Sequence, residues 1–167
     1  MARMRRLLAN LFHGWFRLHR RFPAQLLDEM MAAIAAGERT HRGEVRFVVE
    51  SRLAPMAVLT GLDAALRARQ LFSALRVWDT EGNSGVLVYL LMAERRIEIV
   101  VDRGIATRTG QGEWDALCAG MRARYARGQW REGSLEGIAA VHAVLARHFA
   151  AHGSANPDEL PDRPVLL

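Results

Sequence analysis

Lysine is absent from this sequence, and all 23 of its basic residues are arginines. The absence excludes Schiff-base chemistry, and it excludes a phosphate-binding P-loop, which needs a lysine after its glycines. Cysteine is almost absent too, because Cys118 is the only one, so the chain has no disulfide framework. No Gly-x-Ser-x-Gly elbow, zincin motif or dinucleotide fingerprint is present. The familiar signatures of several enzyme classes are therefore missing.

Long apolar runs are also missing. None reaches the roughly 18 residues that a membrane-spanning helix needs. His13, Arg17 and Arg20 interrupt the apolar pattern near the start, and no cleavage-like site follows, so we do not expect a secretory signal peptide. The chain has 167 residues, half of them apolar, which fits one ordinary globular domain. We expect a cytoplasmic protein that could lie peripherally at the inner face of a membrane.

Acidic residues are missing from positions 1–21, which hold six arginines. The other 17 arginines nearly balance the 18 acids of the chain, so the high pI comes from an N-terminal arm. A basic body that wraps nucleic acid is not indicated, and we expect no nucleic-acid partner.

The arm, residues 1–22, has the apolar spacing of an amphipathic helix, with arginines at both ends. Such a helix could lie on an anionic membrane surface or contact a membrane protein. The residues expected to make that contact are Arg5, Arg6, Phe12, Trp15, Arg20 and Arg21. The alternative is that Leu8, Phe12 and Trp15 dock on the domain itself.

Residues 23–152 have the pattern of one α/β domain. Helices are predicted from Pro23 to Gly37 and over 61–75, 111–127 and 134–150, and strands over 44–50, 86–92 and 97–102. This order predicts a small mixed sheet with helices on both faces, an α/β/α sandwich, in addition to the amphipathic helical arm. Residues 153–167 contain three prolines and no periodicity, so a disordered tail is predicted there.

The loop "WDTEGNSG" (78–85) places several side-chain oxygens directly before the most apolar strand. Strands 86–92 and 97–102 are joined by so short a turn that they form an antiparallel hairpin. The start of one strand then lies beside the end of the other, and a first strand parallel to the third would bring Glu50 to the same edge. The side chains expected to meet there are Asp79, Glu81, Asn83, Asp102, Glu50 and Arg103.

Two interpretations of this edge remain open. Oxygen donors without a Cys–His cluster suit a hard cation, Ca²⁺ or Mg²⁺, and Arg103 could bind an anion or phosphate beside it. The alternative is an ordinary turn, because Asp, Asn and Gly tolerate unusual backbone angles and bond to nearby amides.

The run "WDTEGNSGVLVYLLMAERRIEIVVDRGI", followed by "YARGQWREGSLEGIAAV", resembles the TPM-domain family over about residues 44–150. That family includes thylakoid-lumen phosphatase-like proteins and many bacterial envelope proteins. The resemblance implies a sheet between helices, divalent-metal binding at acidic loops, acid phosphatase activity in some members and maintenance of membrane complexes in others. Bacterial members commonly carry a secretion signal, a transmembrane helix and a Gly-x-Gly pattern after the third strand, where this chain has "DRGI".

Three functions follow as hypotheses. The first is a divalent-metal-binding accessory domain near a membrane or membrane complex, with little or no catalysis. The second is a metal-dependent phosphatase, in which a bound ion would activate water and Arg103 would steady the phosphoryl oxygens. The third is a protein-interaction module whose loop is only a turn.

Overall fold

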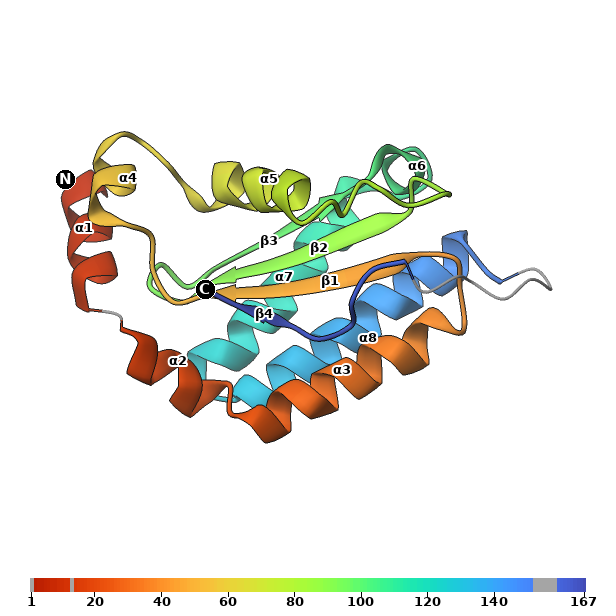
Figure 1. The fold of residues 1–167 in the computed structure, drawn as a ribbon, viewed down its shortest axis with the longest axis horizontal. Coiled ribbons are helices and arrows are strands. Elements are labelled where there is room, and N and C mark those ends of the chain that lie inside the picture. Colours follow the sequence, from red (N-terminus) through yellow and green to blue (C-terminus); the bar gives the residue numbers. More distant parts are fainter. Residues whose placement is uncertain (1, 13, 152–158) are drawn as a thin grey trace.

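A computed structural model describes residues 2–12, 14–151 and 159–167. Eight helices and four strands are present in the described part of the chain (Figure 1). In chain order they are α1 (Ala2–Phe12), α2 (Trp15–Arg21), α3 (Ala24–Glu38), β1 (Glu44–Glu50), α4 (Pro55–Leu59), α5 (Ala64–Ala74), β2 (Gly85–Leu91), β3 (Arg96–Val101), α6 (Arg103–Ala106), α7 (Gln111–Ala126), α8 (Trp130–His148) and β4 (Val165–Leu166).

The strands form one mixed sheet in the order β3-β2-β1-β4. Strands β2 and β3 pair antiparallel, as the short turn between them predicted. Strand β1 runs parallel to β2, because α4 and α5 carry the chain back across the sheet between them. The direction of β1 decides which of its ends lies near the loop at the start of β2.

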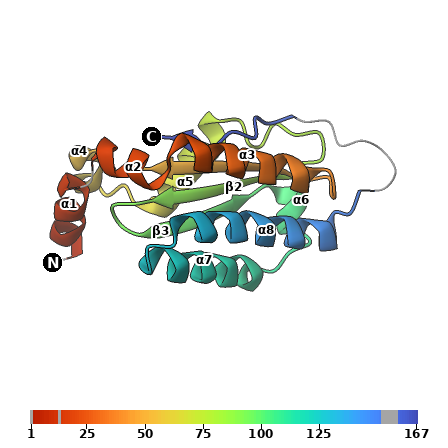
Figure 2. The ribbon, with the colours of Figure 1, turned by 90° about the horizontal axis from the view of Figure 1, so that it is seen from below.

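Helices cover both faces of the sheet, so the predicted sandwich is confirmed. Helices α3, α7 and α8 lie side by side under one face, and α5 lies on the other (Figures 1 and 2). Alternate residues of β1 divide between two cores: Phe47 faces the three-helix layer, and Val48 packs with Leu71 of α5. Every residue of β2 is buried, as expected for a central strand.

The arm is two helices rather than the single helix that the spacing predicted. Gly14 has extended backbone angles and forms the N-cap of α2, so the helical path stops there. Of the side chains expected to dock on the domain, Leu8 and Trp15 are exposed, and that of Phe12 lies outside the described residues. Among the described helices, none is long and apolar enough to span a lipid bilayer.

Residues 159–167 differ from the predicted disordered tail. Strand β4 pairs parallel with β1, and Leu160 is buried in the second core. The Arg46 guanidinium donates hydrogen bonds to the carbonyl oxygens of Pro161 and Arg163. Prolines do not prevent this pairing, because a short edge strand needs few backbone donors. Residues 153–158 of the predicted tail lie outside the described part of the chain.

Candidate functional site

The β2–β3 hairpin brings together part of the predicted site at one end of the sheet. The backbone N–H of Asp102 donates to the carbonyl of Gly85, 2.9 Å away, which joins the two strand ends. Next to it, Nε of Arg103 lies 3.3 Å from Oδ1 of Asn83 and donates to it. We call this end of the sheet, with the loop 78–85, the rim.

Asp102 is the most enclosed acid of the rim hairpin, with a relative exposure of 8%. It is the N-cap of α6, and its Oδ1 accepts a hydrogen bond of 2.7 Å from the backbone N–H of Arg103. Its other oxygen, Oδ2, is buried and has no hydrogen-bond partner among the described residues. Burying a carboxylate oxygen without a hydrogen-bond donor costs free energy, and a proton, a water molecule or a cation bound to this atom would remove that cost.

The loop fits closely over the start of α6. Asn83 has a positive φ of 48°, a conformation that asparagine tolerates better than most residues. A Cβ atom at Gly104 would lie 2.5 Å from the carbonyl oxygen of Asn83 and 2.8 Å from that of Gly82. Only glycine therefore lets these two carbonyls approach the turn that carries Asp102.

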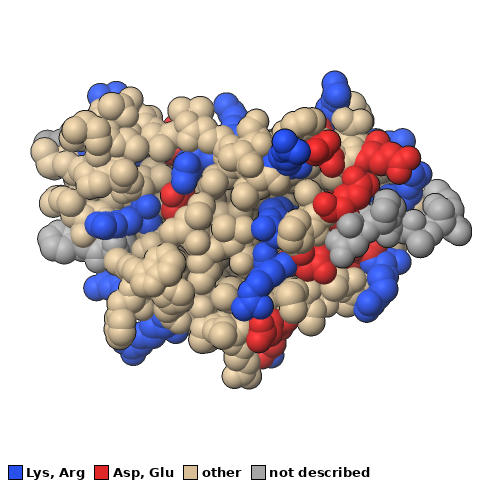
Figure 3. Space-filling model, viewed as in Figure 1, with Lys and Arg blue, Asp and Glu red and all other residues tan. Residues whose placement is uncertain are grey.

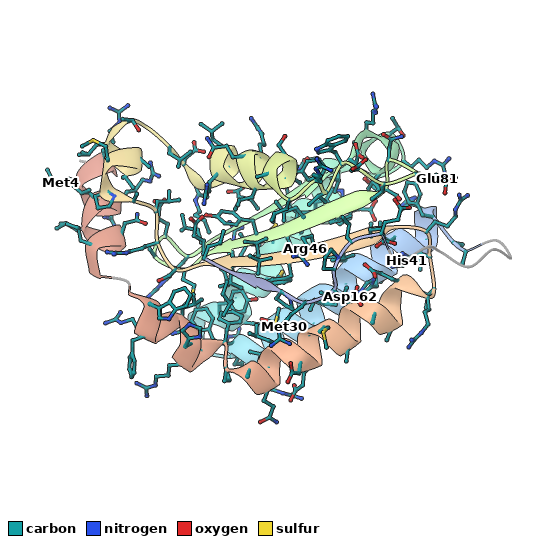
Figure 4. The ribbon with its side chains drawn as sticks, in the orientation of Figure 1. Met4, Met30, His41, Arg46, Glu81 and Asp162 are labelled. Carbon is teal, nitrogen blue, oxygen red and sulfur yellow. The ribbon has the colours of Figure 1, made fainter. Side chains whose placement is uncertain are left out.

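Two of the predicted metal ligands are exposed and make their contacts outside this cluster. Asp79 is exposed, and its carboxylate lies 3.9 Å from the Arg76 guanidinium. Glu81 is also exposed, at the outer end of the molecule (Figure 4), and its backbone N–H donates to the Glu159 carboxylate at 2.9 Å. Within the described ranges, no three His, Cys, Asp or Glu side chains gather closely enough to hold a metal ion. The predicted ligand set is therefore not assembled in this conformation.

The prediction that Glu50 lies at the rim is wrong, because Glu50 lies at the opposite end of the sheet. It pairs in register with Leu91, at the end of β2, whereas the rim lies at the start of β2. There the Glu50 carboxylate binds the Arg67 guanidinium through two nitrogens and accepts a 2.6 Å hydrogen bond from the hydroxyl of Tyr89. The prediction failed because β1 is antiparallel to β3, which follows from its parallel pairing with β2.

Glu44 is the acid that this strand does bring to the rim, and the sequence-based reasoning missed it. It pairs in register with Gly85, and its Oε2 accepts from the backbone N–H groups of Glu159 and Leu160, each at 3.3 Å. A signal was available, because a helical crossover between two strands indicates parallel pairing. The first acid of "EVRFVVE", rather than the last, therefore belongs beside the loop.

A second acidic residue, Glu38, lies buried near Glu44. Its Oε1 accepts a 2.7 Å hydrogen bond from the backbone N–H of Val45. Burial raises the pKa of Glu38 to about 9, and the nearby negative charges of Glu44 and Asp162 add to the rise. Glu38 is therefore a neutral carboxylic acid at physiological pH, able to donate a hydrogen bond to Asp162.

Two buried histidines form a pair between α8 and the segment before β1. Nε2 of His41 lies 2.7 Å from Nδ1 of His142, and the N–H of Gly43 donates to Nδ1 of His41 at 3.1 Å. His41 therefore carries its proton on Nε2, and this N–H donates a hydrogen bond to Nδ1 of His142. Burial lowers the pKa of each imidazole to about 4, so both rings are neutral at pH 7.

Cys118 offers no nucleophile. It is half-buried, and burial raises the pKa of its thiol to about 11, with the negative charge of Glu98 as the next contribution. Only a very small fraction is thiolate at neutral pH, and the thiolate is the reactive form.

The fold is similar to two solved structures of bacterial proteins. The BA42 protein from the psychrophilic bacterium Bizionia argentinensis is 24% identical, with a TM-score of 0.76, and the match covers 86% of this chain and 94% of that one. The N-terminal domain of a protein from P. gingivalis is 21% identical, with a TM-score of 0.59 and coverage of 75% and 80%. No curated protein matches the sequence. These similarities define a class of small α/β domains with a shared fold.

The sequence matches the TPM domain over residues 22–144, which is well over half of the chain. The protein therefore belongs to the TPM domain family, as its motifs suggested.

Proposed function

We propose that this domain binds a divalent cation, with Ca²⁺ preferred, at the rim and acts as a non-catalytic accessory domain. The observation that supports this most is the buried, unpartnered Oδ2 of Asp102. A divalent cation would neutralise the negative charge of this carboxylate and give the oxygen a partner. The nearby oxygens are also of the right type, since Ca²⁺ accepts backbone carbonyls, amide oxygens and waters beside a carboxylate.

Loop 78–85 would supply the remaining oxygens. The carbonyls of Gly82 and Asn83 lie against Gly104, two residues after Asp102. Asp79 and Glu81 stand exposed on the same loop, so a modest movement of that loop could add a carboxylate to the cation. Ca²⁺ suits such a site better than Mg²⁺, because its coordination is larger and less rigid.

The rim favours binding over phosphate-ester hydrolysis. Arg103 is exposed, and its Nε already donates to Asn83. An open, water-accessible site weakens the electrostatic stabilisation on which such catalysis depends. We therefore place catalysis second to binding.

The test measures thermal unfolding with Ca²⁺, Mg²⁺ or EDTA for the wild type and Asp102→Asn. An asparagine keeps the capping oxygen and removes the charge. A ligand at 100 times its Kd stabilises the native state by about 2.7 kcal/mol, which raises the Tm of a domain of this size by roughly 5–10 °C. We expect Ca²⁺ to raise the Tm of the wild type and not that of Asp102→Asn.

Asp63→Asn is the matched control. Asp63 is likewise an N-cap, accepting from the backbone N–H of Leu66 at 2.8 Å, but it belongs to α5. This variant should keep the full response to Ca²⁺. A wild-type Tm unchanged by either cation, or an equal rise in Asp102→Asn, would show that the site is absent.

A further inference from the structure

Polar side chains on one side of α1 bond to the rest of the protein. Asn10 is fully buried, and its side-chain oxygen accepts a 2.7 Å hydrogen bond from the backbone N–H of Leu53. Its side-chain nitrogen donates to Glu94 at 2.9 Å, and Glu94 also forms a 2.8 Å salt bridge with Arg6. These contacts, with the partly buried Leu7, determine which side of the helix turns inward.

The opposite side of α1 is apolar and faces outward. Met4, Leu8 and Leu11 follow one another at four- and three-residue spacing, and all are exposed, Leu8 by 47%. Figure 4 shows Met4 at the end of the molecule opposite to Glu81. The neighbouring α4 and α2 add further large exposed side chains at this end, including Phe16 at 80%. We call the whole set the apolar end: Met4, Leu8, Leu11, Trp15, Phe16, Met56 and Leu59.

Exposed apolar side chains gathered in this way mark a surface that is covered in use. A helix that only strengthened the fold would turn its leucines inward and its polar residues to water. Here the buried Asn10 and the exposed Leu8 have the reverse arrangement. The orientation of α1 therefore indicates an apolar environment outside the molecule.

The charge around the apolar end is positive. The first acid in the sequence is Asp28, and among the described residues Arg3, Arg5, Arg17 and Arg20 form no salt bridge. On the face shown in Figure 3 this end is mainly tan and blue, and acids gather mostly toward the other end.

Arginines of α2 also line a surface cavity of about 830 Å³, shared with Trp130 and Arg131. Arg21 stacks over the Trp130 ring, 4.3 Å from its centroid. Burial lowers the pKa of Arg21, and the positive charges of Arg17, Arg95 and Arg20 lower it further. Glu29 and Glu132 line the cavity as well, and Glu29 forms a 2.6 Å salt bridge with Arg131. The arginines of α2 outnumber the remaining acid, so the lining keeps a net positive charge that an anionic group would offset.

We propose that the apolar end docks on the surface of an anionic lipid bilayer. Helix α1 lies in the interface with Met4, Leu8 and Leu11 among the upper acyl chains, and Trp15 at the headgroup level. The unpaired arginines bind lipid phosphates, and the arginine-lined cavity accepts a headgroup. A second copy of the chain is a poorer occupant, because two such basic ends would repel each other.

The experiment is co-sedimentation of the full chain with extruded vesicles in EDTA, which keeps it independent of the proposed cation site. Vesicles of phosphatidylcholine with 30% phosphatidylglycerol are compared with pure phosphatidylcholine vesicles. We expect binding to the anionic vesicles alone, weakening about tenfold or more between 50 and 500 mM NaCl as charges are screened.

Two variants divide the contributions. Leu8→Ser/Leu11→Ser removes apolar area, and Arg17→Gln/Arg20→Gln removes charge; each should weaken binding about tenfold or more. The matched control is Leu66→Ser on α5, because Leu66 is exposed by 45%, about as much as Leu8. It should bind as the wild type does, and circular dichroism checks that every variant is folded.

Three results would overturn the proposal. The wild type could remain in the supernatant with anionic vesicles at low salt. The Leu8→Ser/Leu11→Ser variant could bind as the wild type does, leaving the apolar end without a role. Light scattering could instead show a wild-type dimer that this variant converts to a monomer without any vesicle binding, which would assign the surface to a second copy of the chain.

Discussion

At the residue scale, two kinds of buried ionisable group give the stability of the protein opposite dependences on pH. Glu38 is held neutral by burial, so it costs stability wherever the unfolded chain would release its proton. The His41–His142 pair is held neutral too, but here the protein loses stability in acid, because the unfolded chain takes up protons that the buried rings do not. Neither effect is visible in the sequence, because both depend on burial and on partners distant along the chain.

Glu38→Gln should stabilise the protein, and this stabilisation should grow as the pH rises. The pKa of Glu38 is raised to about 9 in the folded protein from an unfolded value of 4.5, so wild-type stability falls as pH rises between these values. Glutamine keeps an acceptor for Val45 and never ionises. We expect the variant to be more stable by roughly 1–3 kcal/mol at pH 8 and nearly equal at pH 5.

Urea unfolding at the two pH values measures this difference. Glu132→Gln, at an exposed position of α8, is the control and should change stability little at either pH. An equal effect of Glu38→Gln at pH 5 and pH 8 would contradict a buried neutral acid.

The histidine pair predicts acid sensitivity. Each pKa is lowered to about 4 from an unfolded value of 6.5, so its contribution is complete above pH 6.5 and is lost as pH falls toward 4. His142→Leu should make the loss of stability shallower over this range, although it costs about 1–3 kcal/mol at pH 7 by leaving the Nε2–H of His41 without an acceptor.

The measurement is best made in the Glu38→Gln background, where the opposing titration of Glu38 is removed. The slope of unfolding free energy against pH between 6.5 and 4 is the readout, and the absolute stability is not. If His142→Leu left that slope unchanged, the pair would not be the groups that take up protons.

At the element scale, the hairpin of β2 and β3 was predictable and the ends of the sheet were not. The run "VLVYLLM" and the short turn around "AERR" are strong local signals, and they placed Asn83 beside Arg103. The position of Glu50 instead depended on the direction of β1, and β4 depended on contacts made far along the chain by Arg46. Local patterns do not contain that information, although the crossover between β1 and β2 contained part of it.

Gly104 connects loop 78–85 to α6, and its replacement tests how closely they fit. Gly104→Ala would push its methyl group onto the carbonyls of Gly82 and Asn83, so we expect a loss of about 1–3 kcal/mol. Gly120→Ala is the control, since nothing lies near that position of α7 and alanine should stabilise the helix by about 0.5–1 kcal/mol. Chemical denaturation compares the two, and equal stabilisation by both substitutions would mean that the loop yields without cost.

At the scale of the whole molecule, the basic arm and the rim lie at opposite ends of the longest axis. The helices of the arm stand at one end and α6 with its loop at the other, with Met4 and Glu81 near the two extremes (Figures 1 and 4). Composition predicted the basic arm, because the acids begin only at Asp28. It did not predict that a polar contact through Asn10 turns Leu8 and Leu11 outward, since helical spacing alone does not say which side of a helix meets the protein.

This division has a consequence for what the loop could sense. Helix α8 alone has 19 residues, about 28 Å, and runs along much of the distance between the two ends. Counter-ions crowd a charged lipid sheet only within about 8 Å at physiological ionic strength. A protein bound to a bilayer through its arm would therefore hold Asp102 outside that layer of counter-ions. Binding of Ca²⁺ at the proposed rim site would then follow the calcium concentration of the surrounding solution and would not depend on the lipid composition of the bilayer.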